Sequence, residues 1–317
     1  MLRKIPDPAK GGRHGGPAAR VRAAAPLAHG VASTVVRGGH VVAGIATEIG
    51  WIGAHLARYP LGLLTDTVGG NRDRHGLAKL SPLQRGLIEA GIDVAATPIL
   101  LVHGIVDNHT IFSTLGRALR RRGFTSIWTF DYGLLTVDVR ATARRLAEVV
   151  TQMMAQTGYQ RVHIIGHSLG GLIARYYVQR LGGDAHVHTL VTLGTPHQGT
   201  QLARLAAVLP LVRQLQPESE LVQELTEPAP GCRTRFIAFA SDIDHLIVPS
   251  WRARLDHPDL HATNIAVHRI GHMSLTTNRE VARQIVTALV EAGLDGVPRS
   301  TLRPDHEGPE AEDPEPE

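Results

Sequence analysis

The sequence has little cysteine and few aromatic residues, and each shortage argues against particular classes of protein. A single cysteine, Cys232, excludes an internal disulfide framework, and we expect its thiol to be unreactive. Aromatic residues are only 4% of the 317 residues and no basic stripe is interleaved with them, which argues against nucleic-acid binding despite a net charge of +4. We identify no secretory signal, because the basic start of the chain runs into Pro, Gly and Arg rather than an apolar segment. We therefore expect a cytoplasmic or peripherally membrane-associated protein.

Metal chemistry has equally little support. The sequence contains no His-Glu-x-x-His motif and no pair of cysteines. His186 and His188 alternate along an expected strand, a pattern more typical of a surface than of a ligand pair. We therefore expect neither a metal nor a cofactor, and the sequence indicates no oligomeric state.

The two ends of the chain differ in composition from its middle. Residues 1–30 predict a disordered basic arm, and residues 295–317, rich in proline and acidic residues, predict a disordered acidic tail. Residues 31–94 predict an apolar, amphipathic helical segment. Glu48, two histidines and several glycines make its most apolar part, residues 31–68, a poor membrane-spanning helix. We expect residues 31–68 to lie on the domain or to contact a membrane surface.

Short apolar runs alternate with helical patterns over residues 95–294. Strands are expected at residues 99–102, 126–130, 162–165, 187–193, 236–240 and 265–267. Helices are expected at residues 111–122, 139–154, 169–181 and 280–289. This alternation predicts an α/β domain with a mostly parallel sheet of about six strands and helices on both faces. The active site of such a sheet lies at the carboxyl ends of the strands.

One strand-to-helix junction carries a motif with chemical meaning, Gly166-His167-Ser168-Leu169-Gly170. Gly-x-Ser-x-Gly between a strand and a helix forms a sharp turn that exposes the serine hydroxyl at the N-terminus of the helix. The motif also occurs by chance, so the rest of the chain must supply a base, a carboxylate and an oxyanion hole.

Each of these parts has a candidate at a strand end. The order Ser, Asp, His that accompanies this motif points to Asp244 as the carboxylate, with Asp242 as its rival, and to His272 as the base. We favour Asp244 because an apolar run and Pro249 follow it, and His272 because Gly271 lets the chain turn. The backbone N–H groups of Ile105 and Leu169 are the expected oxyanion donors.

These segments resemble bacterial lipases and esterases of the α/β-hydrolase fold. The resemblance covers residues 95–293 and is carried by the segments Leu101-Val102-His103-Gly104-Ile105, Gly166–Gly171, Gly194-Thr195-Pro196-His197-Gln198-Gly199-Thr200, and Asp244 with Val248-Pro249 and Gly271-His272. It implies that Ser168 is the nucleophile, Asp244 the carboxylate, His272 the base, and Ile105 and Leu169 the oxyanion donors. One more residue than the family usually has separates Asp244 from Val248, which keeps Asp242 as an alternative.

Residues 198–231 are not strand-like and predict short amphipathic helices interrupted by Pro210 and Pro217. They form either a small helical cap over the active site or helices that simply pack on the sheet. We therefore expect a serine hydrolase of lipid-like carboxylic esters. An acyltransferase or thioesterase would use the same three residues. An inactive, membrane-associated interaction protein with this fold is a third hypothesis, suggested by residues 31–68.

Overall fold

One sheet of six parallel strands organises the part of the chain that the computed structural model describes, residues 97–105, 109–132 and 138–294. Every neighbouring pair in the order β2-β1-β3-β4-β5-β6 is parallel. The strands are β1 (Ile99–Val102), β2 (Ile127–Phe130), β3 (Val162–His167), β4 (Val187–Leu193), β5 (Arg235–Ser241) and β6 (His261–Val267). The expected parallel sheet of about six strands is therefore confirmed.

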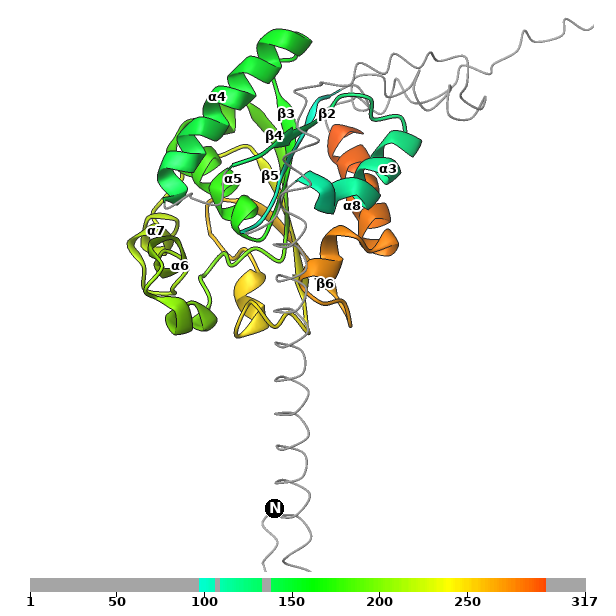
Figure 1. The fold of residues 1–317 in the computed structure, drawn as a ribbon. Helices are drawn as coiled ribbons and strands as arrows, with labels where there is room; N and C mark the ends of the chain where they lie inside the picture. The colour runs from blue at the N-terminus through cyan, green and yellow to red at the C-terminus, as the bar shows by residue number, and fades with distance from the viewer. Residues whose placement is uncertain (1–96, 106–108, 133–137, 295–317) are drawn as a thin grey trace, which may run out of the picture. The chain divides into compact units, whose positions relative to one another are not determined.

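Helices cover both faces of the sheet, as expected. Helices α4 (Val139–Thr157) and α5 (Leu169–Arg180) lie on one face, and α3 (Ser113–Arg121) and α8 (Arg279–Leu294) lie on the other (Figure 1). Successive residues of a strand point to opposite faces. Leu100 and Ile164 accordingly join the core under α4 and α5, whereas Leu101 and Ile165 join the core under α3 and α8.

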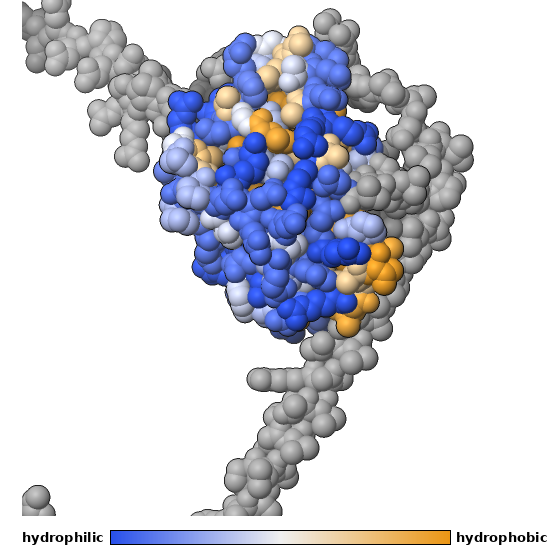
Figure 2. All heavy atoms as spheres, turned by 90° about the vertical axis from the view of Figure 1, so that its left-hand side faces the viewer, coloured by the Kyte–Doolittle hydropathy of each residue, from blue (hydrophilic) through white to orange (hydrophobic). Residues whose placement is uncertain are grey.

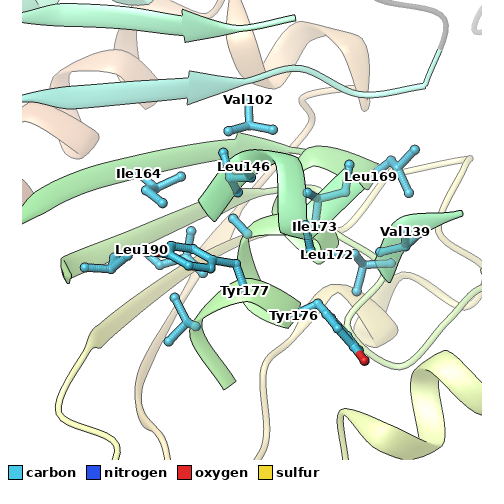
Figure 3. Packing of buried hydrophobic residues seen from close by; sticks show 14 of the residues in the cluster. Val102, Val139, Leu146, Ile164, Leu169, Leu172, Ile173, Tyr176, Tyr177 and Leu190 are labelled. Atoms are coloured by element: carbon cyan, nitrogen blue, oxygen red, sulfur yellow. The ribbon is translucent and has the colours of Figure 1, made fainter. Parts of the chain in front are cut away.

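Helix α5, which follows the Gly-x-Ser-x-Gly motif, is buried on nearly every side. All its residues from Leu169 to Val178 are buried, because the sheet lies on one side and α4 on another. Figure 3 shows Leu172 and Ile173 of α5 among Val102, Leu146 and Ile164 of the neighbouring elements. A helix packed all round has little freedom to move, so its first turn is held in place.

Strand and helix ends differ from the expected ones by a few residues. Helix α8 ends at Leu294 rather than at residue 289. Strand β6 begins at His261 rather than at residue 265. As the edge strand, β6 has one half-exposed side, so its first residues lack the continuous apolar run of a buried strand. Helix α4 continues three residues beyond the expected end and stops at Gly158, whose φ of 79° ends the helix.

Residues 198–231 form three short helices, η5 (Gln201–Ala206), α6 (Pro210–Arg213) and α7 (Glu220–Glu224). Pro210 begins α6 instead of interrupting a helix, because its fixed φ suits the first helical position. Helix α7 is anchored: the Arg140 guanidinium of α4 forms a bidentate pair with Glu224, at 2.6 Å for the shortest contact.

The other half of this segment is exposed. Leu205, within η5, and Val208, just after it, expose 83% and 82% of their surface, although both are apolar. Figure 2 looks at this side of the molecule and shows apolar atoms at its lower edge. The segment therefore has a fixed half around α7 and an apolar, solvent-facing half around η5.

In the described part of the chain, four further 3₁₀ helices connect the elements: η3 (His109–Phe112), η4 (Gly183–Ala185), η6 (Ser250–Ala253) and η7 (Met273–Thr276). Within the described ranges, no helix combines the length and the apolar character needed to cross a membrane. The predictions for residues 1–30, 31–94 and 295–317 lie outside the described residues.

Candidate active site

Ser168 lies in a strained turn between β3 and α5. Its φ of 51° and ψ of −120° are a backbone conformation that residues other than glycine rarely adopt. Within the described ranges, Arg269 is the only other non-glycine residue with a positive φ. The turn is possible because strand and helix approach closely. A Cβ on Gly166 would lie 2.6 Å from the Gly171 Cα. The strained backbone of Ser168 and the close approach of Gly166 to Gly171 together hold the Ser168 hydroxyl at the start of α5.

The loop after β1, which carries Ile105, lies against the same turn. A Cβ on Gly170 would lie 2.3 Å from the backbone oxygen of His103, so β1 and the first turn of α5 are in direct contact there. Ile105 is half-buried and packs on the cluster that contains Leu169. The two expected oxyanion donors therefore belong to segments in contact with each other.

Tyr132 holds the loop after β1 from the end of β2. Its hydroxyl donates to the His103 backbone oxygen at 2.7 Å, and its ring stacks on the His103 ring at a centroid distance of 4.3 Å. The His103 Nδ1 binds the backbone oxygen of Gly104 at 2.9 Å. Tyr132 is not predicted as a site residue, since an aromatic residue after a strand has no sequence pattern that indicates a role.

Asp244 and His272 form a buried pair at the ends of β5 and β6. The Asp244 Oδ2 lies 2.7 Å from the His272 Nδ1, and the two side chains are 0% and 1% exposed. The Asp244 Oδ1 accepts hydrogen bonds from the N–H groups of Leu246 and Ile247 at 2.9 and 3.0 Å. Burial opposes ionisation of Asp244, but His272 and these two N–H groups outweigh it and hold the pKa of the carboxyl below its usual value. An ionised Asp244 keeps the proton of His272 on Nδ1 and makes Nε2 the basic nitrogen of the ring.

Asp242, the alternative carboxylate, has different partners. Its Oδ2 lies 2.9 Å from the His268 Nδ1, and its Oδ1 accepts from the N–H of Arg269 at 2.9 Å. The backbone N–H of Arg269, followed by the His268 side chain, lowers the pKa of Asp242. This pair is exposed, with 47% of Asp242 and 72% of His268 accessible. The two aspartates thus bind different histidines, and Asp242 tethers the chain that leads to His272.

The buried pair lies beside the serine turn. The ring of His167, directly before Ser168, is 4.8 Å from the His272 ring, and its Nε2 is 3.3 Å from the His272 backbone oxygen. The Ser168 N–H donates to the Leu193 backbone oxygen at 2.9 Å. The structure therefore brings Ser168, Asp244 and His272 together at the carboxyl ends of β3, β5 and β6.

Gly194, directly after β4, leaves room for the pair. A Cβ at this position would lie 3.0 Å from both the Asp244 Oδ2 and the His272 Nδ1. From the sequence, the Gly194–Thr200 segment is marked only by the resemblance to lipases. Its contacts are with residues far away in the chain, so no local pattern predicts them.

Arg175 is a second residue that sequence reasoning does not find. Its guanidinium is buried and donates to the backbone oxygens of His197 and Leu225 at 2.9 and 2.7 Å. Burial lowers the pKa of Arg175 to about 9. It connects α5 to the loop after β4 and to the end of α7. A lone arginine in a helical pattern resembles any surface arginine, so no sequence signal marks it.

Other reactive groups lie away from this site. Burial, with the Asp184 carboxylate nearby, raises the pKa of the Cys232 thiol to about 11, which keeps it protonated. Across the described residues, no group of three histidine, cysteine or acidic side chains could hold a metal ion.

Comparison with known proteins identifies the fold. The family described as the alpha/beta hydrolase fold matches residues 97–216 of the chain. The chain has the α/β-hydrolase fold. The mature form of the Bacillus licheniformis lipase BlEst2 superposes with a TM-score of 0.51 at 19% identity, over 62% of this chain and 92% of that one. The Aspergillus fumigatus lipase B superposes with a TM-score of 0.52 at 18% identity, over 63% and 54% of the two chains.

Curated relatives with sequence similarity are lipases. The triacylglycerol lipase of Pseudomonas fragi is 33% identical over 119 residues, which are 35% of this chain and 39% of the relative. The triacylglycerol lipase of Vibrio cholerae serotype O1 is 28% identical over 144 residues, or 44% and 43% of the two chains. The predicted resemblance to bacterial lipases is thereby confirmed. The matched parts span about two fifths of these relatives.

Proposed function

We propose that the protein is a serine hydrolase that cleaves carboxylic esters of lipid-like substrates. The observation that carries this proposal is the buried 2.7 Å contact between Asp244 and His272 beside the strained turn of Ser168. A carboxylate, an imidazole and a serine on a strand-to-helix turn are the parts of an acyl-transfer site. The similarity to two triacylglycerol lipases supports an ester as the substrate.

The roles follow from the chemistry of each group. The Ser168 hydroxyl attacks the ester carbonyl carbon, and the His272 Nε2 takes its proton. Asp244 stabilises the imidazolium that forms and fixes the orientation of the ring. The backbone N–H groups of Ile105 and Leu169 stabilise the oxyanion of the tetrahedral intermediate, each contributing about 2.7–4 kcal/mol.

The intermediate collapses as His272 returns the proton to the leaving alcohol, and an acyl-enzyme on Ser168 remains. His272 then takes a proton from the water that attacks the acyl carbonyl. It returns this proton to the Ser168 oxygen as the bond between Ser168 and the acyl group breaks, which releases the carboxylic acid. If an alcohol replaces water as the acyl acceptor, the same residues catalyse acyl transfer, and if the acyl group arrives as a thioester, they catalyse thioester hydrolysis. The acceptor distinguishes transfer from hydrolysis, so the test includes it.

The test combines labelling with turnover. We expect a fluorophosphonate to label the wild-type chain and not Ser168→Ala, and p-nitrophenyl esters to be hydrolysed by the former only. Ser126→Ala, a hydroxyl at the start of β2 that accepts from Trp128 Nε1, is the matched control and should be labelled normally. A profile over acyl-chain length, with and without an alcohol acceptor, then separates hydrolysis from transfer.

A wild-type chain that is neither labelled nor active would refute the proposal and favour an inactive interaction protein. The membrane contact of residues 31–68 stays a separate prediction. Deleting residues 1–68 should reduce partitioning into lipid vesicles without loss of ester hydrolysis.

A further inference from the structure

The segment Gly194–Thr200 follows β4 and contacts the surroundings of the Asp244–His272 pair at both of its ends. At its first residue, Gly194, the absent side chain makes room for the pair, and the Gly194 N–H donates to the Phe239 backbone oxygen at 3.0 Å. At its last residue, Thr200, it contacts the chain just after Asp244. The role that we infer for Thr200 rests on the proposed function.

The Thr200 hydroxyl uses all of its hydrogen-bonding capacity. It donates to the Leu246 backbone oxygen at 2.9 Å, and it accepts from the N–H groups of Val248 at 2.9 Å and Leu202 at 3.3 Å. A hydroxyl has one proton to donate and two lone pairs, so no capacity is left for water. Thr200 is only 6% exposed, which protects these contacts from competition with solvent.

Two of these contacts bracket the residues that hold Asp244. The N–H groups of Leu246 and Ile247 bind the Asp244 Oδ1, and Thr200 binds the chain at Leu246 and again at Val248. The Gln201 N–H adds a third contact, to the Val248 backbone oxygen at 2.9 Å. Residues 246–248 are therefore held by Thr200 and Gln201 as well as by the carboxylate that they orient.

Thr200 is itself held in relation to the helix of Ser168. Three residues earlier, His197 is buried, and its Nε2 lies 2.9 Å from the Thr192 Oγ1. Arg175 of α5 donates to the His197 backbone oxygen at 2.9 Å. A chain of short contacts thus runs from α5 through His197 and Thr200 to residues 246–248.

We propose that Thr200 is a positioning residue for the reaction, which acts through residues 246–248 to orient the Asp244 carboxylate toward His272. The hydroxyl, not the bulk of the side chain, performs this role. Without it, the N–H of Val248 and the oxygen of Leu246 lose their partner, and the segment that orients Asp244 loses one of its anchors.

The test compares two substitutions at Thr200 in the full chain. Thr200→Val keeps the shape and removes the hydroxyl, whereas Thr200→Ser keeps the hydroxyl and removes the methyl group. Thr157→Val is the matched control, because the Thr157 hydroxyl also donates to a backbone oxygen, that of Met153, and accepts from the Tyr159 N–H, far from Asp244 in the chain. The measurements are kcat and KM for p-nitrophenyl butyrate, the pH profile of kcat/KM and the thermal midpoint.

We expect Thr200→Val to lower kcat about 10- to 100-fold with little change in KM. The acidic limb of kcat/KM should move to lower pH, since a poorly aligned Asp244 stabilises the His272 imidazolium less. Thr200→Ser should retain nearly wild-type kcat and the wild-type limb, and Thr157→Val should match the wild type in both.

Several results would overturn the proposal. Wild-type kcat and pH profile in Thr200→Val would show that the hydroxyl does not act through Asp244. Equal loss in Thr200→Ser would assign the effect to the methyl group. If Thr200→Val does not fold, Thr200→Ala replaces it, and failure of both to fold would make the hydroxyl a folding requirement instead.

A wild-type chain without esterase activity would refute the proposed function but still test Thr200. The downfield resonance of the His272 Nδ1 proton reports its hydrogen bond to Asp244 independently of turnover. We expect this resonance in the wild type and in Thr200→Ser. In Thr200→Val it should be shifted or lost, and its persistence there would refute the positioning role.

Discussion

The carboxylate of Asp244 binds the His272 Nδ1 at 2.7 Å inside the protein, where neither side chain is more than 1% exposed. Only two residues earlier, Asp242 binds a different histidine on the surface. The proposed chemistry therefore depends on a choice between two adjacent carboxylates, and this choice can be tested.

Asp244→Asn and Asp242→Asn should affect activity very unequally. Removing the buried carboxylate leaves His272 without its orienting partner, and kcat should fall on the order of 10⁴-fold. Asp242 takes part in an exposed pair worth at most about 1 kcal/mol, so kcat for Asp242→Asn should fall by less than about fivefold. Steady-state kinetics on p-nitrophenyl butyrate measures both. Similar, mild losses in the two variants would place the working carboxylate elsewhere.

Gly194→Ala should damage activity more than stability. The new Cβ would lie 3.0 Å from both the Asp244 Oδ2 and the His272 Nδ1, at a φ of 53°. We expect a loss of kcat on the order of 10²-fold from the displaced pair and about 1–2 kcal/mol of destabilisation from the backbone. Gly182→Ala is the matched control, since Gly182 has a φ of 74° but nothing within 4 Å of the added Cβ. It should lose similar stability and keep its activity; equal kcat in the two variants would contradict the prediction.

His163 should make the protein less stable in mild acid. Burial, with His188 and Arg161 nearby, lowers the pKa of His163 to about 3 from 6.5. Below pH 6.5, His163 is therefore protonated in the unfolded chain but stays neutral in the folded chain. The free energy of unfolding falls as the pH falls from 6.5 toward 3. At pH 5.5 the loss attributable to His163 should be about 1.4 kcal/mol relative to neutral pH.

Urea unfolding of His163→Leu at pH 7.5 and 5.5 measures this contribution. The variant should show a smaller difference between the two pH values than the wild type. His261→Leu, at an exposed histidine of β6, is the control and should retain the wild-type difference. An unchanged difference in His163→Leu would show that other groups cause the acid sensitivity.

The exposed apolar residues beside η5 should matter for lipid substrates only. Leu205 and Val208 are 83% and 82% exposed, so the double variant with glutamine at both positions should unfold within about 0.5 kcal/mol of the wild type. Hydrolysis of soluble p-nitrophenyl butyrate should be unchanged. Hydrolysis of an emulsified long-chain ester should fall about tenfold or more if these side chains enter the lipid. Val290→Gln, at an exposed position on α8, is the control; an equal fall there would indicate a general loss of surface binding.

Much of the fold follows from local patterns. Apolar runs such as Ile99–Val102 are long enough to identify buried parallel strands, and the strand-to-helix context of Gly166–Gly170 identifies the turn at Ser168. The start of β6 is predicted less well, because an edge strand has one half-exposed side and a weak apolar pattern. Residues 198–231 also divide into an anchored and an exposed half that their helical pattern does not separate.

By itself, the sequence determined the α/β architecture, the place of Ser168 and the small set of side chains that could serve it, because these depend on periodicity and chain order. Tertiary structure decided which aspartate binds His272, since Asp242 and Asp244 follow the same strand and differ only in the direction imposed by the loop. It also decided what Gly194, Arg175 and Thr200 contact. Thr200 and Leu246 are 46 residues apart, and no local pattern encodes a contact made over such a separation.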